Sequence, residues 1–134
     1  MKNIWTNGCY DILHIGHIRL FEFAKSLGDK LIVGIDADNR VRRSKGNNRP
    51  INSQEFRKEI LQAVKFIDEV YIFHSDDELC NLIKQHNIDT IVVGSDYKDK
   101  NVIGSQFSKQ TVFFPRTIDI STSKIYESHN QSTT

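Results

Sequence analysis

The stretch TNGCYDILHIGH, residues 6–17, decides the fold because it joins two segments with different hydrophobic periods. The residues before it, Asn3–Thr6, are predicted to form a strand, and Gly8 allows the chain to turn where that strand ends. After it, apolar side chains recur at helical spacing from Gly16 to Leu27. A helix that begins at Gly16 presents N–H groups and a partial positive charge, and both favour the binding of a phosphate group there.

The rest of the chain alternates short apolar runs with amphipathic segments. Further strands are predicted at residues 30–35, 69–73, 90–93 and 111–114. A basic loop is expected at residues 40–49, and helices at 53–66, 76–86 and 121–127, with Ser53 and either Asp76 or Asp77 as N-caps. This order predicts the α/β class, with a doubly wound parallel sheet of five strands and helices on both faces. One domain is expected over residues 1–127, followed by a polar tail at 128–134.

Composition excludes several classes of protein. The chain has 134 residues, of which 38% are hydrophobic and 26% charged, the balance of a globular domain rather than a disordered one. The formal net charge is +1, so no overall field draws the chain to nucleic acid or to a membrane. No apolar run approaches the roughly 20 residues of a membrane span, and the first residues lack the apolar core of a signal peptide. Only two cysteines are present, Cys9 and Cys80, so a cytoplasmic protein is expected.

One segment departs locally from this neutral balance. Residues 40–49 contain no acidic residue and five basic ones: Arg40, Arg42, Arg43, Lys45 and Arg49. A solvated loop and a nucleic-acid patch are both consistent with this run. No aromatic residue lies inside it, however, which disfavours stacking on single-stranded nucleic acid. We therefore expect no nucleic-acid partner.

Two histidines, His14 and His17, flank the predicted helix start. Histidine donates hydrogen bonds to phosphate oxygens, so the pair suits an anionic ligand at this position. Two other interpretations compete. In the first, the histidines belong to the core and backbone groups satisfy their ring nitrogens. In the second, they bind a metal ion together with Cys9. The metal interpretation lacks a fourth ligand at a familiar spacing.

The motif His-x-Gly-His after the first strand resembles the signature of the cytidylyltransferase-like nucleotidyltransferase superfamily. A second motif, RTIDISTS at residues 116–123, stands where that family carries Arg-Thr-x-Gly-Ile-Ser-Thr-[ST]. Asp119 departs from the pattern, although Asp tolerates left-handed backbone better than most residues. The resemblance extends to about residue 127 and implies a Rossmann-like fold. It also implies transfer of NMP from a nucleoside triphosphate to a phosphorylated small molecule, with release of pyrophosphate.

The resemblance assigns roles by position. It implies that catalysis falls to His14, His17, Lys45 and Arg116. Asp38 and Arg57 are expected to bind the acceptor substrate. The residues expected to bind the nucleotide are Gly8, Cys9, Tyr10, Asp11, Gly16, Asp96, Thr117, Ser121, Thr122 and Ser123. Mg²⁺ is expected to accompany the triphosphate without dedicated protein ligands, and a homodimer is expected by analogy.

Two subfamilies compete for the donor and the acceptor. Segments at 31–33, 45–50, 94–98 and 102–105 resemble the nucleotidyltransferase domain of ADP-heptose synthase, which implies ATP and a sugar 1-phosphate. Pro115 with the motif at 116–123 instead resembles glycerol-3-phosphate cytidylyltransferases, which implies CTP and a polyol phosphate. We favour the heptose type because more of the chain agrees with it. A non-catalytic nucleotide-binding module is the remaining alternative.

Overall fold

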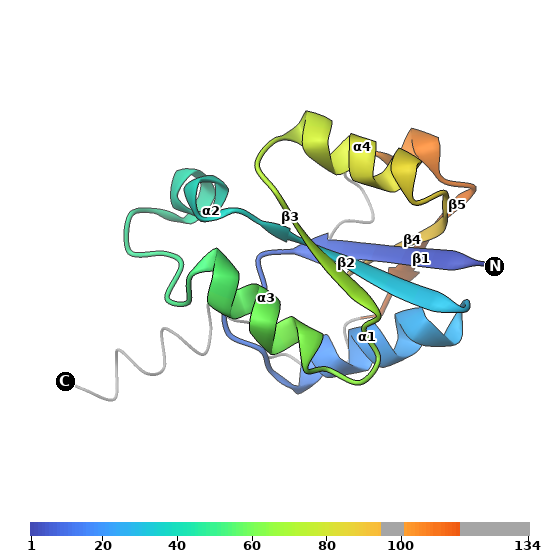
Figure 1. Cartoon of the computed structure of the whole chain (residues 1–134), viewed down its shortest axis with the longest axis horizontal. Helices are drawn as coiled ribbons and strands as arrows, with labels where there is room; N and C mark the ends of the chain where they lie inside the picture. Colours follow the sequence, from blue (N-terminus) through green and yellow to red (C-terminus); the bar gives the residue numbers. More distant parts are fainter. Residues whose placement is uncertain (95–100, 116–134) are drawn as a thin grey trace.

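The computed structural model describes residues 1–94 and 101–115, which form a single sheet flanked by helices (Figure 1). Its elements, in chain order, are β1 (Asn3–Gly8), α1 (Ile15–Ser26), β2 (Lys30–Asp36), α2 (Asp38–Lys45), α3 (Gln54–Gln62), β3 (Glu69–Phe73), α4 (Asp76–Gln85), β4 (Ile88–Gly94), the short 3₁₀ helix η2 (Ser105–Phe107) and β5 (Gln110–Phe114). None of the helices in these two ranges is long and apolar enough to span a membrane.

The sheet has five parallel strands in the order β3-β2-β1-β4-β5. The chain moves outward from β1 to β3 and then returns across the sheet to β4. Strand order therefore reverses beside β1, and the loops at the carboxyl ends of β1 and β4 diverge there, as in other open α/β sheets that bind ligands. The predicted class, strand number and parallel pairing are confirmed.

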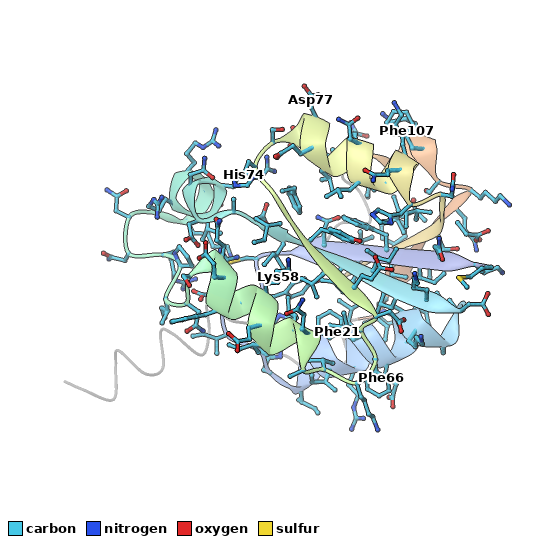
Figure 2. The ribbon with its side chains drawn as sticks, viewed as in Figure 1. Phe21, Lys58, Phe66, His74, Asp77 and Phe107 are labelled. Carbon is cyan, nitrogen blue, oxygen red and sulfur yellow. The ribbon has the colours of Figure 1, made fainter. Side chains whose placement is uncertain are left out.

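Helices cover both faces of the sheet, as expected. Helices α1 and α3 pack on one face, whereas α4 and η2 lie on the other (Figure 1). Alternate strand residues supply the two cores: Ile4 packs toward α1 and α3, and its neighbour Trp5 packs toward α4. Figure 2 shows the same division, with Phe21 on the α1 side of the sheet and Phe107 on the α4 side.

A glycine in β2 makes room for the largest side chain of the α4 face. Trp5 is fully buried and its Nε1 donates a hydrogen bond to Asn7 Oδ1 at 2.8 Å. A Cβ atom at Gly34 would lie 2.4 Å from Trp5 Cζ2 and 3.2 Å from Phe73 Cε1. The indole therefore occupies the space that a side chain at this position would need, which explains why the apolar run of β2 is interrupted by glycine.

Three boundaries differ from the sequence-based expectation. The expected basic loop is largely helical, because residues 38–45 form α2 with Asp38 in its first turn and basic residues in its last, which complements the helix dipole. Helix α3 ends at Gln62, earlier than expected, because the following residues turn to bring Ile67 into the core. The N-cap of α4 is Ser75, whose hydroxyl accepts the Glu78 N–H at 3.1 Å.

Other expectations fall on residues that lie outside the described ranges. They are the final helix at 121–127, the domain boundary at residue 127 and the polar tail at 128–134.

Candidate active site

The predicted site residues that the structure describes gather at the carboxyl ends of β1 and β2. The loop after β1 carries His14 and the first turn of α1 carries His17. Helix α2 follows β2, and the start of α3 packs beneath both segments. The fold thus brings three groups of predicted site residues to one edge of the sheet: the two histidines, residues 8–11 with Gly16, and Asp38. Asp96, Arg116, Thr117, Ser121, Thr122 and Ser123 lie outside the described residues.

The two histidines hold the start of α1 through reciprocal hydrogen bonds. His14 is the N-cap residue, and its Nδ1 accepts the Gly16 N–H at 3.0 Å. The Nδ1 of His17 in turn accepts the His14 N–H at 3.1 Å. The rings lie against each other, with centroids 3.9 Å apart and planes tilted by 32°. Each half-buried ring is therefore fixed by a backbone contact and by its neighbour.

These contacts determine where the ring protons sit. A ring nitrogen that accepts an N–H carries no proton, so each neutral histidine bears its proton on Nε2. Nε2 is then the atom that can donate to an anion. The N–H groups of Gly16 and His17 are already bound, to the ring and to the carbonyl of His14 respectively. These two amides are therefore occupied within the protein, and a phosphate group at this helix start can instead accept hydrogen bonds from the rings.

Tyr10 supports the histidine pair from the core side. Its ring packs edge-on to His17, with a centroid distance of 5.5 Å, and to Phe21 at 5.2 Å. Its backbone is left-handed, with φ of 51°, which folds the ring back over β1. A Cβ atom at Gly8 would lie 3.1 Å from that ring, so glycine at this position allows the close approach. Tyr10 is 8% exposed, so its side chain contributes to packing beneath the site.

Asp11 joins the histidine loop to the segment before α3. Its carboxylate accepts the backbone N–H groups of Ile51 and Asn52, at 2.7 and 2.8 Å. The Asn52 side-chain amide donates back to the Asp11 carbonyl at 2.8 Å. Asp11 is only 2% exposed, so this positioning is the role that the structure shows. No local sequence pattern predicts the role of Asn52, because its contact with Asp11 joins residues about forty positions apart.

Arg57 is the centre of the buried network. Its side chain is 0% exposed, and its Nη1 donates to the carbonyls of Cys9 and Asp36, at 2.9 and 2.8 Å. Its Nε donates to the Asn52 carbonyl at 3.0 Å, and its Nη2 to Asp38 Oδ1 at 2.7 Å. Direct substrate binding by Arg57 would have to compete with these four bonds. The structure instead makes Arg57 the residue that ties the ends of β1 and β2 to α2 and α3.

Lys45 and Cys9 complete this edge. Lys45 is exposed at the end of α2, where its ammonium group complements the helix dipole. Burial raises the pKa of the Cys9 thiol, and the nearby charges of Lys45 and Arg57 offset the rise only in part. The thiol form of Cys9 is therefore favoured at neutral pH, and the thiol is a weaker nucleophile than the thiolate. No metal-binding group of three His, Cys, Asp or Glu side chains occurs in residues 1–94 and 101–115, so the metal interpretation has no geometric support.

Comparison with known proteins identifies the family. The cytidylyltransferase-like family model matches residues 5–128. The chain belongs to the cytidylyltransferase-like family. The resemblance drawn from the two motifs is thereby confirmed.

Among curated proteins, the chain is similar to the bifunctional protein HldE of several bacteria. It is 48% identical to the Campylobacter fetus protein over 107 residues, which cover 80% of this chain and 23% of the relative. It is 47% identical to the Campylobacter jejuni RM1221 protein and 44% identical to the Helicobacter pylori P12 protein. Each of these two matches covers 94% of this chain and 27% of the relative. The chain thus spans about a quarter of the length of these relatives.

Solved structures show the same fold. A lipopolysaccharide core biosynthesis protein from Thermoplasma volcanium aligns with a TM-score of 0.74 at 24% identity, covering 88% of this chain and 99% of the other. The pantothenate synthetase of Thermus thermophilus aligns with a TM-score of 0.68 at 12% identity, covering 98% of this chain and 64% of the other. These likenesses support the Rossmann-like architecture of the chain.

Proposed function

We propose that the chain is a nucleotidyltransferase that transfers AMP from ATP to a sugar 1-phosphate of the heptose type and releases pyrophosphate. The observation that carries the proposal is the histidine pair at the carboxyl end of β1. Both rings are held by their Nδ1 atoms, so each can donate only from Nε2. Two such donors at a helix start, in a chain of the cytidylyltransferase-like family, suit a triphosphate.

The proposed step is an in-line displacement at the α-phosphorus. An oxygen of the acceptor phosphate forms the new P–O bond, while the bond between the α-phosphorus and the α,β-bridging oxygen breaks. The electron pair leaves with pyrophosphate. The acceptor phosphate is ionised at pH 7, so no general base is required, and no enzyme-bound intermediate forms. Catalysis then depends on positioning and on charge stabilisation. His14 and His17 donate to the triphosphate, and Lys45 and Arg116 neutralise the charge that develops.

The choice of ATP and a heptose-type acceptor rests on the HldE relatives and on the segments that resemble ADP-heptose synthase. Glycerol-3-phosphate cytidylyltransferase activity is the alternative, and the motif at residues 116–123 is its basis. Asp38 is proposed to contact the acceptor.

We further propose Mg²⁺ as the companion of the triphosphate, where it would neutralise phosphate charge. A homodimer and a cytoplasmic location are proposed by analogy and from the two free cysteines. Chelation of Mg²⁺ should abolish turnover, and light scattering of the purified protein should give twice the chain mass.

A substrate matrix tests the function. ATP and CTP are each paired with heptose 1-phosphates, hexose 1-phosphates and glycerol 3-phosphate, and pyrophosphate release is measured. Release with ATP and a heptose 1-phosphate is the expected result. Release with CTP and glycerol 3-phosphate would support the alternative. Nucleotide binding without pyrophosphate release from any pair would show a non-catalytic module and overturn the proposal.

A further inference from the structure

Helix α2 begins without a cap of its own. Its N-cap residue, Ala37, has no side chain that can accept a hydrogen bond. The first N–H groups of a helix have no partner within that helix, so they need one from elsewhere. The Asp38 N–H finds it in a different helix, where Gln54 Oε1 accepts at 2.9 Å. Gln54, the first residue of α3, thus caps α2.

The same face of α3 also holds the Asp38 side chain. Arg57 lies three residues after Gln54, which places both side chains on one face of the helix. Arg57 Nη2 donates to Asp38 Oδ1 at 2.7 Å. Asp38 is therefore fixed at two points, through its backbone by Gln54 and through its carboxylate by Arg57. Its side chain is 25% exposed, and Oδ2 makes no hydrogen bond with the described residues.

Arg57, which holds the Asp38 carboxylate, also connects it to the loop after β1. The guanidinium that holds Asp38 donates through its other terminal nitrogen to the Cys9 carbonyl, in the loop after β1. A shift of Asp38 relative to this loop would break one of these short bonds. The position of the Asp38 carboxylate is thus set with respect to the segment that carries the proposed triphosphate donors.

We propose that Gln54 is a positioning residue for acceptor recognition. It holds the start of α2 so that Asp38 Oδ2 accepts a hydrogen bond from a hydroxyl group of the acceptor sugar, since a carboxylate accepts where a hydroxyl donates. The inference rests on the proposed transfer to a phosphorylated sugar. It assigns Gln54 an indirect role, because its oxygen binds the protein backbone rather than the substrate.

Gln54→Met is the decisive variant, because it keeps the length of the side chain and removes the acceptor oxygen. Loss of one oriented hydrogen bond should raise the KM and the Kd of the sugar 1-phosphate by about five- to tenfold, while the KM of ATP changes by less than about twofold. Gln62→Met is the matched control, since Gln62 is an exposed residue at the other end of α3. Equal weakening of sugar phosphate and ATP would indicate general damage and overturn the proposal.

A double-mutant cycle tests the route through Asp38. In an Asp38→Ala background, Gln54→Met should leave acceptor binding unchanged, because the carboxylate that Gln54 positions is gone. A further five- to tenfold loss in that background would show that Gln54 acts independently of Asp38 and would overturn the proposal. Gln54→Ala replaces Gln54→Met throughout if the methionine variant fails to fold.

Hydrogen exchange separates this inference from the proposed function. Without substrate, the Asp38 amide should exchange faster in Gln54→Met than in the wild type or in Gln62→Met. Unchanged exchange would refute the cap and the inference with it. A wild-type protein that binds a sugar 1-phosphate but releases no pyrophosphate would refute only the proposed function. Failure to bind any sugar phosphate would refute both.

Discussion

At the scale of single residues, one ring nitrogen of each histidine binds the backbone, and the other is proposed to bind the ligand. Of the three interpretations of His14 and His17 that the sequence leaves open, two concern hydrogen bonds of the rings: a backbone-satisfied core pair and a phosphate-binding pair. The structure shows the backbone contacts at Nδ1, and these contacts place the proton on Nε2. The two readings are therefore compatible, because they concern different nitrogens of the same rings.

Substitutions at His17 should separate the two nitrogens. The side-chain oxygen of His17→Asn can take over the hydrogen bond from the His14 N–H, but nothing replaces Nε2. We expect turnover to fall by about 10²–10³-fold, with stability close to that of the wild type. His17→Ala loses both nitrogens, so it should also lose about 1 kcal/mol of stability.

Pyrophosphate release and urea denaturation of the three proteins provide the measurements. Near-wild-type turnover in His17→Asn would remove His17 from the catalytic assignment. Equal stability of the Asn and Ala variants would show that the Nδ1 contact contributes little to the folded state.

At the scale of elements, the packing of β2 against β1 depends on the space left at Gly34. Gly34→Ala would place a methyl group 2.4 Å from the fully buried Trp5 ring. Because neither strand can move without disturbing the sheet, we expect a loss of about 1–3 kcal/mol in the free energy of unfolding. Gly94→Ala, at the end of β4, is the control, since no atom of the described residues lies within 4 Å of its added Cβ. A Gly34→Ala protein as stable as this control would show that Trp5 relocates easily.

The elements also show what the sequence can and cannot predict. The strands follow from their apolar runs, and the start of α1 follows from the glycine and histidine pattern. The sequence predicts a basic loop at residues 40–49 where most of α2 lies, because Val41 is the one apolar residue of this helix and a single residue shows no helical period. The side chain that caps it belongs to Gln54, which lies sixteen residues after Asp38. The hydrogen bond between Asn52 and Asp11 likewise joins residues that are about forty positions apart. Such contacts exist only once the sheet has brought the segments together, so no local pattern predicts them.

At the scale of the whole molecule, the candidate site and a prominent ion pair lie at opposite ends of the sheet. The site residues lie at the carboxyl ends of β1 and β2, whereas the ion pair between Lys30 and Glu69 joins the amino ends of β2 and β3. Hydrogen bonds from Lys30 and Tyr71 hold the pKa of Glu69 below its ordinary value. Glu69, a carboxylate whose pKa is lowered by folding, is thus separated from the groups that are proposed to bind substrate.

This separation predicts that acid stability can be changed without changing activity. The pKa of Glu69 is lower in the folded chain than in the unfolded chain, so its contribution is present at neutral pH and is lost as the pH falls below the ordinary carboxyl value of 4.5 and through the folded pKa. Glu69→Gln cannot titrate, so its free energy of unfolding should fall less steeply with acidification than that of the wild type. Urea denaturation between pH 7 and pH 3 measures the slopes, and pyrophosphate release at pH 7 should be unchanged. Parallel slopes would assign the acid sensitivity to other carboxylates, and reduced turnover would show that the two ends of the sheet are coupled.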